Sequence, residues 1–282
     1  MSEQNKTVLS FEIFPPKKDD DFDGVFSVCD KLAELHPAFI SCTYGAGGSR
    51  SKKTVEVTDY IQNKLGIEAI AHMTCVGNKK EDIDAVASEL KKVGVTHVLA
   101  LRGDRPKDMS DEQFESREFA HASDLITYLK KNDDFKFAGA CYPEKHPEAM
   151  SKRGDIANLK RKVECGASHL ISQLFMDNDV YYEFQEQCLA SGITVPIHAG
   201  IMPITSAKMV STTIAMSGTS IPKAFSDLVV KYGDNNDDMR KAGVDYAIRQ
   251  LQDLIDNGAD GIHIYSMNKP KATKEIVDAL RF

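Results

Sequence analysis

The sequence predicts an α/β protein built as an eight-fold β/α (TIM) barrel, and three observations lead to this fold class. Eight short apolar runs typical of strands alternate with helix-like runs along the 282 residues. Four of the helix-like runs end in a glycine just before the next strand. The strand-like runs also end in polar side chains, and the carboxyl ends of barrel strands carry the chemistry. A doubly wound open sheet is the alternative, because strands are hard to count from one sequence.

The predicted strands are residues 8–14, 38–43, 67–74, 96–101, 135–141, 168–174, 195–201 and 260–265. Helical spacing fills the gaps between them, as in Lys80–Val93 and Ile156–Cys165. The glycines that close helix-like runs are Gly94, Gly166, Gly192 and Gly258. Two segments are less regular. Residues 105–118 are predicted to form a mobile polar loop over the barrel mouth, and residues 217–238 an irregular helix-plus-loop insertion after the seventh strand.

The polar side chains at the strand ends follow the two-residue period of a strand. Residues two apart share a face, so Ser10 and Glu12 lie together on the first strand. On the fourth strand the same rule groups Ala100 with Arg102 and Asp104, opposite the leucines at 99 and 101. Buried polar groups need partners, so this regularity predicts one shared polar pocket. The residues concerned are Glu12, Thr43, His72, Thr74, Arg102, Asp104, Gln173, His198, His263 and Tyr265.

Composition and charge fit one soluble globular domain covering residues 1–282. The net charge of −7 argues against a nucleic-acid partner, which favours a basic surface. No apolar stretch approaches the roughly 20 residues of a membrane span. The N-terminal segment MSEQNKTVLS lacks the layout of a signal peptide, which predicts a cytoplasmic protein. The six cysteines show no CxxC spacing and are expected to be reduced, buried thiols.

Two groups at strand ends are candidates for chemistry. Glu12 lies in an apolar strand, where burial would raise its pKa and suit it to act as a general acid. The alternative is a structural carboxylate that is salt-bridged to Arg102. Arg102, Gly103 and Asp104 end the fourth strand, where arginine can pair with phosphate or carboxylate and glycine permits close approach of a ligand. An ordinary turn can carry the same three residues.

Other polar segments follow the next strand. The loop from Tyr142 to Ala149 holds His146 between two prolines, but no second histidine stands at ligand spacing, so no metal site is predicted. A helix then presents a polar edge that suits phosphate or adenine-ribose recognition, or is simply a solvated face. Its residues are Asp155, Asn158, Arg161 and Lys162. The glycines of residues 45–48 match neither dinucleotide nor Walker motifs, so any nucleotide is held in another way.

Taken together and in order, these strings resemble the catalytic domain of methylenetetrahydrofolate reductases, in the bacterial type that lacks a long regulatory domain. The resemblance runs from about residue 8 to the end of the chain and rests on FEIFPP at 11–16, TYG at 43–45, HMTC at 72–75, ALRGD at 100–104, ASDL at 122–125, YPE at 142–144, HPEA at 146–149, NLKRK at 158–162, Gln173, GI at 200–201 with Pro203, and YSMN at 265–268. It implies a β/α barrel that binds FAD. The implied reaction reduces 5,10-methylenetetrahydrofolate to 5-methyltetrahydrofolate with NADH or NADPH, in two half-reactions through the flavin, and supplies methyl groups for methionine synthesis. It also implies a homo-oligomer.

By this resemblance, Glu12 matches the family's acid, which helps to protonate the bridging amine so that the methylene ring opens to an iminium. Asp104 matches the carboxylate between flavin and pterin, and Gln173 the amide that hydrogen-bonds pterin and nicotinamide alternately. Tyr265 and Lys269 complete the expected substrate contacts. The expected FAD contacts are Thr43, Tyr44, Ala46, His72, Arg102, Gly103, Asp104, His121, Ala122, Tyr142, His146, Ala149, Asp155, Asn158, Arg161 and Lys162.

The chain departs from the family pattern at Met209, Thr213, Lys269 and His121, where a polar residue, an aromatic residue, an arginine and a tyrosine are common. The folate-tail and nicotinamide contacts, the choice between NADH and NADPH, and the oligomeric state therefore stay open. Two other classes also stay open. One is a folate-binding barrel of a methyltransferase system, and the other is a non-catalytic folate- or nucleotide-binding subunit.

Overall fold

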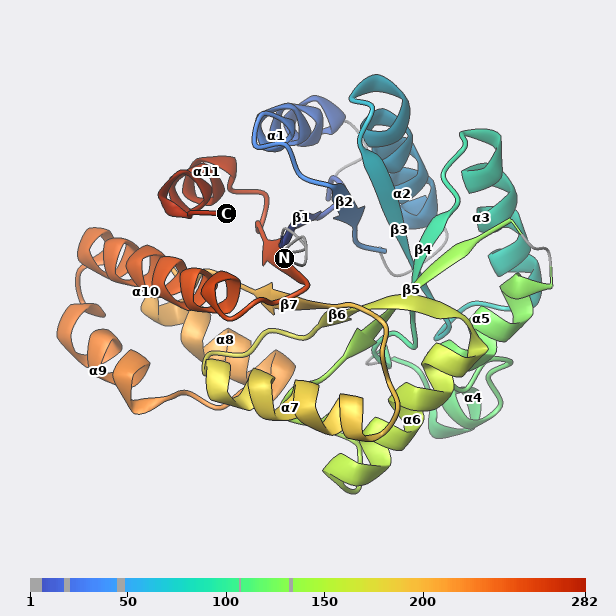
Figure 1. Cartoon of the computed structure of the whole chain (residues 1–282). Helices are drawn as coiled ribbons and strands as arrows, with labels where there is room; N and C mark the ends of the chain where they lie inside the picture. Colours follow the sequence, from blue (N-terminus) through green and yellow to red (C-terminus); the bar gives the residue numbers. More distant parts are fainter. Residues whose placement is uncertain (1–6, 18–20, 45–48, 107, 132–133) are drawn as a thin grey trace, which may run out of the picture. The chain divides into compact units, whose positions relative to one another are not determined.

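The computed structural model confirms the predicted fold: eight strands form a closed barrel in the order β1 to β8, with helices around it (Figure 1). The structure describes residues 7–17, 21–44, 49–106, 108–131 and 134–282. Neighbouring strands pair in parallel, as for β2 with β3 and for β7 with β8. The alternative of an open sheet is therefore wrong. The strands are β1 Val8–Ile13, β2 Phe39–Cys42, β3 Glu68–Thr74, β4 His97–Leu101, β5 Lys136–Cys141, β6 Ala167–Ser172, β7 Ile197–Ile201 and β8 Gly261–Tyr265.

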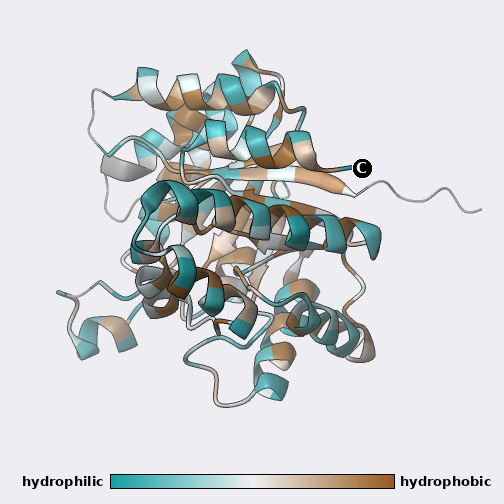
Figure 2. Ribbon diagram, turned by 90° about the vertical axis from the view of Figure 1, so that its left-hand side faces the viewer, coloured by the Kyte–Doolittle hydropathy of each residue, from teal (hydrophilic) through white to brown (hydrophobic). Residues whose placement is uncertain are grey.

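The helices follow the strands in the expected alternation. They are α1 Phe22–Ala33, α2 Ser49–Asp59 with the π-helical turn η1 Tyr60–Lys64, α3 Lys80–Lys92, α4 Asp111–Glu115, α5 Ala122–Lys130, α6 Lys152–Cys165, α7 Asn178–Ala190, α8 Ala207–Ser217, α9 Lys223–Tyr232, α10 Asn236–Asp256 and α11 Pro270–Ala279. Their ribbons alternate hydrophilic and hydrophobic residues, as expected for helices with one buried face (Figure 2). None of the helices in the described ranges has the length and apolar character that crossing a membrane requires.

The chain separates into two compact units. Unit 1 comprises residues 1–10, 141–160 and 170–282, and unit 2 comprises residues 11–140 and 161–169. The interpretation of residues 1–282 as a single domain stays a prediction.

The sequence located the elements well and misjudged two segments. All four predicted helix-ending glycines have positive φ, and Gly94 and Gly258 have open space around them, so backbone conformation is what requires glycine there. The predicted irregular insertion at 217–238 is more ordered than expected, because it holds all of α9 and the start of α10. The predicted loop at 105–118 contains the short helix α4. All six cysteines are free thiols, and Cys165 is only half-buried.

The strand register of unit 2 shows which side chains share a face. Residues paired across a parallel ladder point to the same side, and His72 of β3 pairs with Leu99 of β4. Thr74 likewise pairs with Leu101. The predicted face of β4 was therefore wrong, because Leu99 and Leu101, and not Ala100, lie on the face of His72. The strand ends at Leu101, so Arg102 and Asp104 lie beyond the alternating part of the chain.

Unit 1 carries an apolar cluster outside the strands. Met176, Ile204, Phe225 and Met239 are buried together, and side chains of α8, α9 and α10 pack against them. Met209, where the family pattern has a polar folate contact, is one of these packed side chains. The structure thus gives Met209 a packing role.

Candidate functional site

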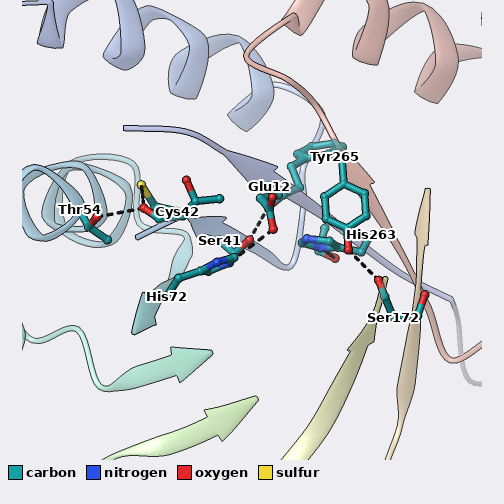
Figure 3. Close-up of polar contacts among 11 residues, drawn as sticks. Glu12, Ser41, Cys42, Thr54, His72, Ser172, His263 and Tyr265 are labelled. Carbon is teal, nitrogen blue, oxygen red and sulfur yellow. Dashed lines mark hydrogen bonds and ion pairs between the residues drawn. The ribbon is translucent and has the colours of Figure 1, made fainter. Parts of the chain in front are cut away.

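A glutamate and a histidine meet inside the barrel within unit 2. Nε2 of His72 lies 3.4 Å from Oε2 of Glu12, and the two side chains are only 6% and 12% exposed. Figure 3 shows the carboxylate and the imidazole pointing toward one another. Glu12 belongs to β1 and His72 to β3, with β2 between them. Side chains two strands apart can meet only on the concave inner face, so this pair lines the barrel interior.

Burial controls the protonation of Glu12. Loss of water around the carboxylate raises the pKa of Glu12 above its ordinary value, and the charge of His72 partly opposes that rise. A larger fraction of Glu12 is therefore protonated near neutral pH than for an exposed glutamate. The alternative interpretation paired Glu12 with Arg102. The structure brings Glu12 beside His72, and Nε of Arg102 donates to the carbonyl of Gly103, so the pairing of Glu12 with Arg102 stays a prediction.

Gly103 explains the close junction between the ends of β3 and β4. Its φ is +84°, and a Cβ at this position would lie 3.0 Å from Cβ of Thr74. Glycine is therefore required both for the backbone conformation and for the close approach. The N–H of Cys75 donates to the carbonyls of Leu101 and Arg102, which ties the two strand ends together. Asp104 is exposed immediately after this junction.

The remaining predicted FAD contacts of unit 2 lie at strand or helix ends. Thr43 follows β2, and its N–H donates to the carbonyl of Ile13 at the end of β1. Tyr44 follows it and donates its hydroxyl to Asn78 at 3.5 Å. His121 is the N-cap of α5 and Ala122 is its first residue. On α6, Lys162 donates to the carbonyl of Ala140, and Arg161 is exposed. Ala46 lies outside the described residues.

Positive side chains gather around Cys75 at the ends of β3 and β4. The pKa of the Cys75 thiol is raised to about 12, chiefly by burial and then by the charge of Asp124, whereas Arg117, Arg102 and Lys162 oppose the rise. Arg102 and Lys162 were predicted from the sequence, but Arg117 was missed because its segment was interpreted as a polar loop. Several cations beside the N-terminus of α5 suit a phosphate-bearing cofactor such as FAD. The donor set of this unit therefore fits the expected cofactor.

In unit 1 the loop after β5 is held around His146. Its N–H donates to Oδ2 of Asp155 at 2.8 Å, its Nδ1 accepts from the N–H of Glu148 at 3.1 Å, and its ring packs edge-on against Tyr142. Asp155 thus fixes the loop that carries His146 and Ala149. Asn158 is exposed on α6, three residues before Arg161, so the two share one edge of that helix.

The predicted substrate contact Tyr265 lies across β7 in the same unit. Its hydroxyl donates to the carbonyl of Ser172 at 2.6 Å (Figure 3). Tyr265 is on β8 and Ser172 is on β6, so the ring passes over Gly200 of β7. A Cβ at Gly200 would lie 2.1 Å from the Ser172 carbonyl and 2.9 Å from the tyrosine ring. Gly200 is therefore needed for the position of Tyr265.

The other residues of unit 1 divide between the candidate site and the surface. Gln173 follows β6, donates its N–H to the carbonyl of Cys141 at 2.7 Å, and accepts through Oε1 from Leu174. Thr213 is buried on α8, whereas Lys269 is exposed at the N-cap of α11. The buried imidazole of His263 contacts Ser10 at 2.8 Å, and burial lowers its pKa to about 3, so it stays neutral. The two-residue period of the strands placed Ser10 and His263 on polar faces, but the sequence did not predict that the two side chains meet.

No group of three or more histidine, cysteine, aspartate or glutamate side chains in the described part of the chain is arranged to hold a metal ion.

The comparisons with known proteins identify the family. A model of the family described as methylenetetrahydrofolate reductase matches residues 1–281. The chain belongs to the methylenetetrahydrofolate reductase family. It is 32% identical to 5,10-methylenetetrahydrofolate reductase of Escherichia coli K12 over 277 residues, covering 98% of this chain and 92% of that relative. It is 33% identical to methylenetetrahydrofolate reductase (NADH) 1 of Arabidopsis thaliana and spans 48% of that longer protein.

Family membership makes this chain a methylenetetrahydrofolate-reducing enzyme of one-carbon metabolism, and it confirms the resemblance drawn from the motifs. Solved structures support the fold. An uncharacterised protein from Clostridium thermocellum superposes with a TM-score of 0.68 at 15% identity, covering 98% of this chain and 94% of that one. Dihydropteroate synthase from Xanthomonas albilineans superposes with a TM-score of 0.56 at 11% identity, covering 98% of this chain and 92% of that one.

Proposed function

We propose that this reductase uses FAD and NADH or NADPH to convert 5,10-methylenetetrahydrofolate to 5-methyltetrahydrofolate in two successive half-reactions. The observation that carries the proposal is the buried Glu12 carboxyl, whose raised pKa suits proton donation near neutral pH. A folate- or nucleotide-binding subunit without catalysis has no need for a buried acid, because burying a carboxyl opposes its ionisation. The C. thermocellum structure contains 5-methyltetrahydrofolate, which gives a precedent for folate in a barrel of this type.

Glu12 performs the acid step. In its neutral form it donates a proton to the bridging amine nitrogen of the substrate, and the carbon–nitrogen bond of the five-membered ring breaks. The bond's electron pair stays on that nitrogen, and an iminium cation forms at the other nitrogen. The resulting carboxylate of Glu12 then stabilises this cation. His72 limits the rise in the pKa of Glu12, so both protonation states are accessible during turnover.

The cofactor, when bound, would accept a hydride from the nicotinamide and pass it to the iminium carbon. Arg102, Lys162 and the N-terminus of α5 would bind its phosphates, while Thr43, Tyr44 and His72 would contact it from the ends of β2 and β3. We propose the same assignment for Tyr142, His146, Ala149, Asp155, Asn158 and Arg161. Asp104 would orient folate against the cofactor, and Gln173, Tyr265 and Lys269 would bind substrate. Each assignment is a proposal that substitution can test separately.

We also propose a cytoplasmic homo-oligomer. The name of the Arabidopsis relative specifies NADH, which favours NADH as the first donor to test for this chain.

The test is an absorption spectrum of the purified protein, followed by anaerobic addition of NADH and then of methylenetetrahydrofolate. Flavin bands that bleach with NADH and return with folate are expected. If the bands bleach and never return, the assignment as a flavoprotein stands, but methylenetetrahydrofolate is not the electron acceptor. A colourless protein that takes up no added FAD and oxidises neither NADH nor NADPH would overturn the proposal.

A further inference from the structure

Three arginines of unit 2 surround one phenylalanine ring after β4. The guanidinium carbons of Arg117, Arg105 and Arg102 lie 3.9, 5.2 and 5.9 Å from the centroid of Phe114. A planar guanidinium over an aromatic face is a favourable arrangement that also fixes the side chain. The ring of Phe114 therefore gathers positive charge at the carboxyl end of β4.

Among the residues that the structure describes, Arg117 is fixed in place without a carboxylate as a hydrogen-bond partner. Its two terminal nitrogens donate to the backbone carbonyls of Phe114 and Ala120. Within the described residues, its Nε is buried and has no hydrogen-bond partner. Neutral carbonyls orient a guanidinium but leave its formal charge in place. Burial also reduces solvent screening of that charge, so it acts over a longer distance.

Arg105 provides a contrast on the same ring. Its guanidinium lies 2.6 Å from the carboxylate of Asp111, so its charge is neutralised locally. It also donates to the carbonyl of Met109 at 2.8 Å. Arg105 and Arg117 thus share the phenylalanine and differ in whether a carboxylate accompanies them. This difference makes Arg105 a matched control.

The positive charge of Arg117 acts on Cys75 at the junction of β3 and β4. Arg117, Arg102 and Lys162 all act on Cys75, whose Sγ contacts the carbonyls of Leu101 and His121 at 3.2 and 3.4 Å. The acidic group that faces Cys75 is Asp124. That carboxylate accepts hydrogen bonds from the N–H groups of Ala120 and His121, where it caps α5. The charged groups that act on Cys75 are thus three cations and one carboxylate.

We propose that Arg117 provides fixed positive charge for the pyrophosphate of the flavin dinucleotide at the junction of β3, β4 and α5. This rests on the proposed use of FAD. A pyrophosphate carries negative charge that the guanidinium of Arg117 would attract, whereas the isoalloxazine ring is uncharged. Arg117 acts through its charge rather than through a direct hydrogen bond, because its nitrogens are buried or engaged with carbonyls.

The test compares binding of FAD and of riboflavin, which lacks phosphate, to apoprotein prepared by removing the flavin. Flavin fluorescence reports both affinities. We expect Arg117→Gln to weaken FAD binding about tenfold, as for one partly screened charge–phosphate interaction, and to leave riboflavin binding unchanged. It should also reduce the dependence of FAD affinity on salt. Arg117→Lys, which keeps the charge, should restore most of the affinity, and Arg105→Gln should change neither ligand.

Two results would overturn the inference while leaving the proposed function intact. One is wild-type affinity for FAD in folded Arg117→Gln protein. The other is an equal loss for FAD and riboflavin, which indicates a structural role for Arg117 in the turn from Phe114 to Ala120. If wild-type apoprotein binds no FAD, both the cofactor proposal and this inference fail together.

Discussion

Unit 2 holds two glutamate–histidine pairs, and their pKa values are shifted in opposite directions. Glu12 and His72 lie 3.4 Å apart inside the barrel, with the carboxylate side chain 12% exposed. Glu68 and His97 lie 2.9 Å apart at the amino ends of β3 and β4, with the carboxylate 46% exposed. Burial dominates at Glu12 and raises its pKa. The hydrogen bond from His97 dominates at Glu68 and lowers its pKa.

The difference shows how position in one barrel divides chemistry from stability. The same two side-chain types, paired from nearby strands, give a carboxyl with a raised pKa where water is excluded and one with a lowered pKa where water remains. The amino-end pair also packs into a cluster of rings. The ring centroids of His97 and His169 lie 5.0 Å apart in an edge-on arrangement, and those of His169 and Phe39 lie 5.8 Å apart. In β/α barrels the carboxyl end is catalytic and the amino end supports stability, and the proposed acid role of Glu12 fits that division.

Replacing each glutamate in turn should give the largest difference between the two pairs, in the rate of folate reduction. Glu12→Gln is expected to lower the rate of folate reduction by about 10²- to 10⁴-fold, because a general acid contributes on that scale. The protein should stay yellow and NADH should still bleach it, since that step needs no proton from Glu12. Glu68→Gln should leave both half-reactions unchanged. Stopped-flow absorbance measures each half-reaction. If the Glu12→Gln protein reduces folate at the normal rate, Glu12 is not the general acid.

The pH dependence of the folate half-reaction should depend on the first pair alone. Its rate is expected to fall as pH rises through the pKa of Glu12, which lies above the ordinary 4.5. His72→Gln should move that fall to higher pH, because the charge of His72 lowers the pKa of Glu12. Near the midpoint the change should be about tenfold or less, since one pKa unit corresponds to tenfold. A fall that moves to lower pH would contradict the pairing, and Glu68→Gln is the control.

Stability should respond to the first pair in the direction opposite to activity. A raised pKa means that folded Glu12 holds its proton more tightly than unfolded Glu12, so ionisation costs stability as pH rises from the unfolded pKa to the folded one. Glu12→Gln removes that cost, and we expect it to stabilise the protein by about 1 kcal/mol at pH above the folded pKa and less in acid. Urea unfolding at several pH values measures this. Destabilisation at high pH would show that the contact with His72 outweighs burial.

The smallest effect is expected at the second pair. The lowered pKa of Glu68 contributes stability that is present above its ordinary value of 4.5 and is lost as pH falls through the folded pKa. Glu68→Gln should therefore cost under about 1 kcal/mol at neutral pH, because the carboxylate is nearly half exposed and screened by solvent. The cost should disappear in strong acid, as read from urea unfolding at pH 7 and pH 3. A constant cost across this range would indicate packing of Glu68 rather than its charge.

The sequence by itself determined the local features of this protein. Apolar runs with polar ends located the eight strands, and glycines before the strands marked helix ends that have positive φ. The two-residue period put Glu12 and His72 at polar positions, because alternation is a property of each strand alone. The ordered motifs were enough to indicate the family. These features depend on neighbours in the chain, which is why the sequence contains them.

Only the tertiary structure decided which of these residues meet. Glu12 contacts His72 because barrel curvature joins β1 and β3 across β2, and no spacing in the sequence encodes that curvature. The side of β4 that faces the same way as His72 was predicted wrongly. The two-residue period groups residues within one strand, but only the pairing register between β3 and β4 shows that Leu99 lies beside His72. Gly200 is required by a carbonyl from β6 and a tyrosine from β8. The proposed role of Arg117 depends on the fold, which brings its guanidinium together with those of Arg105 and Arg102 around Phe114.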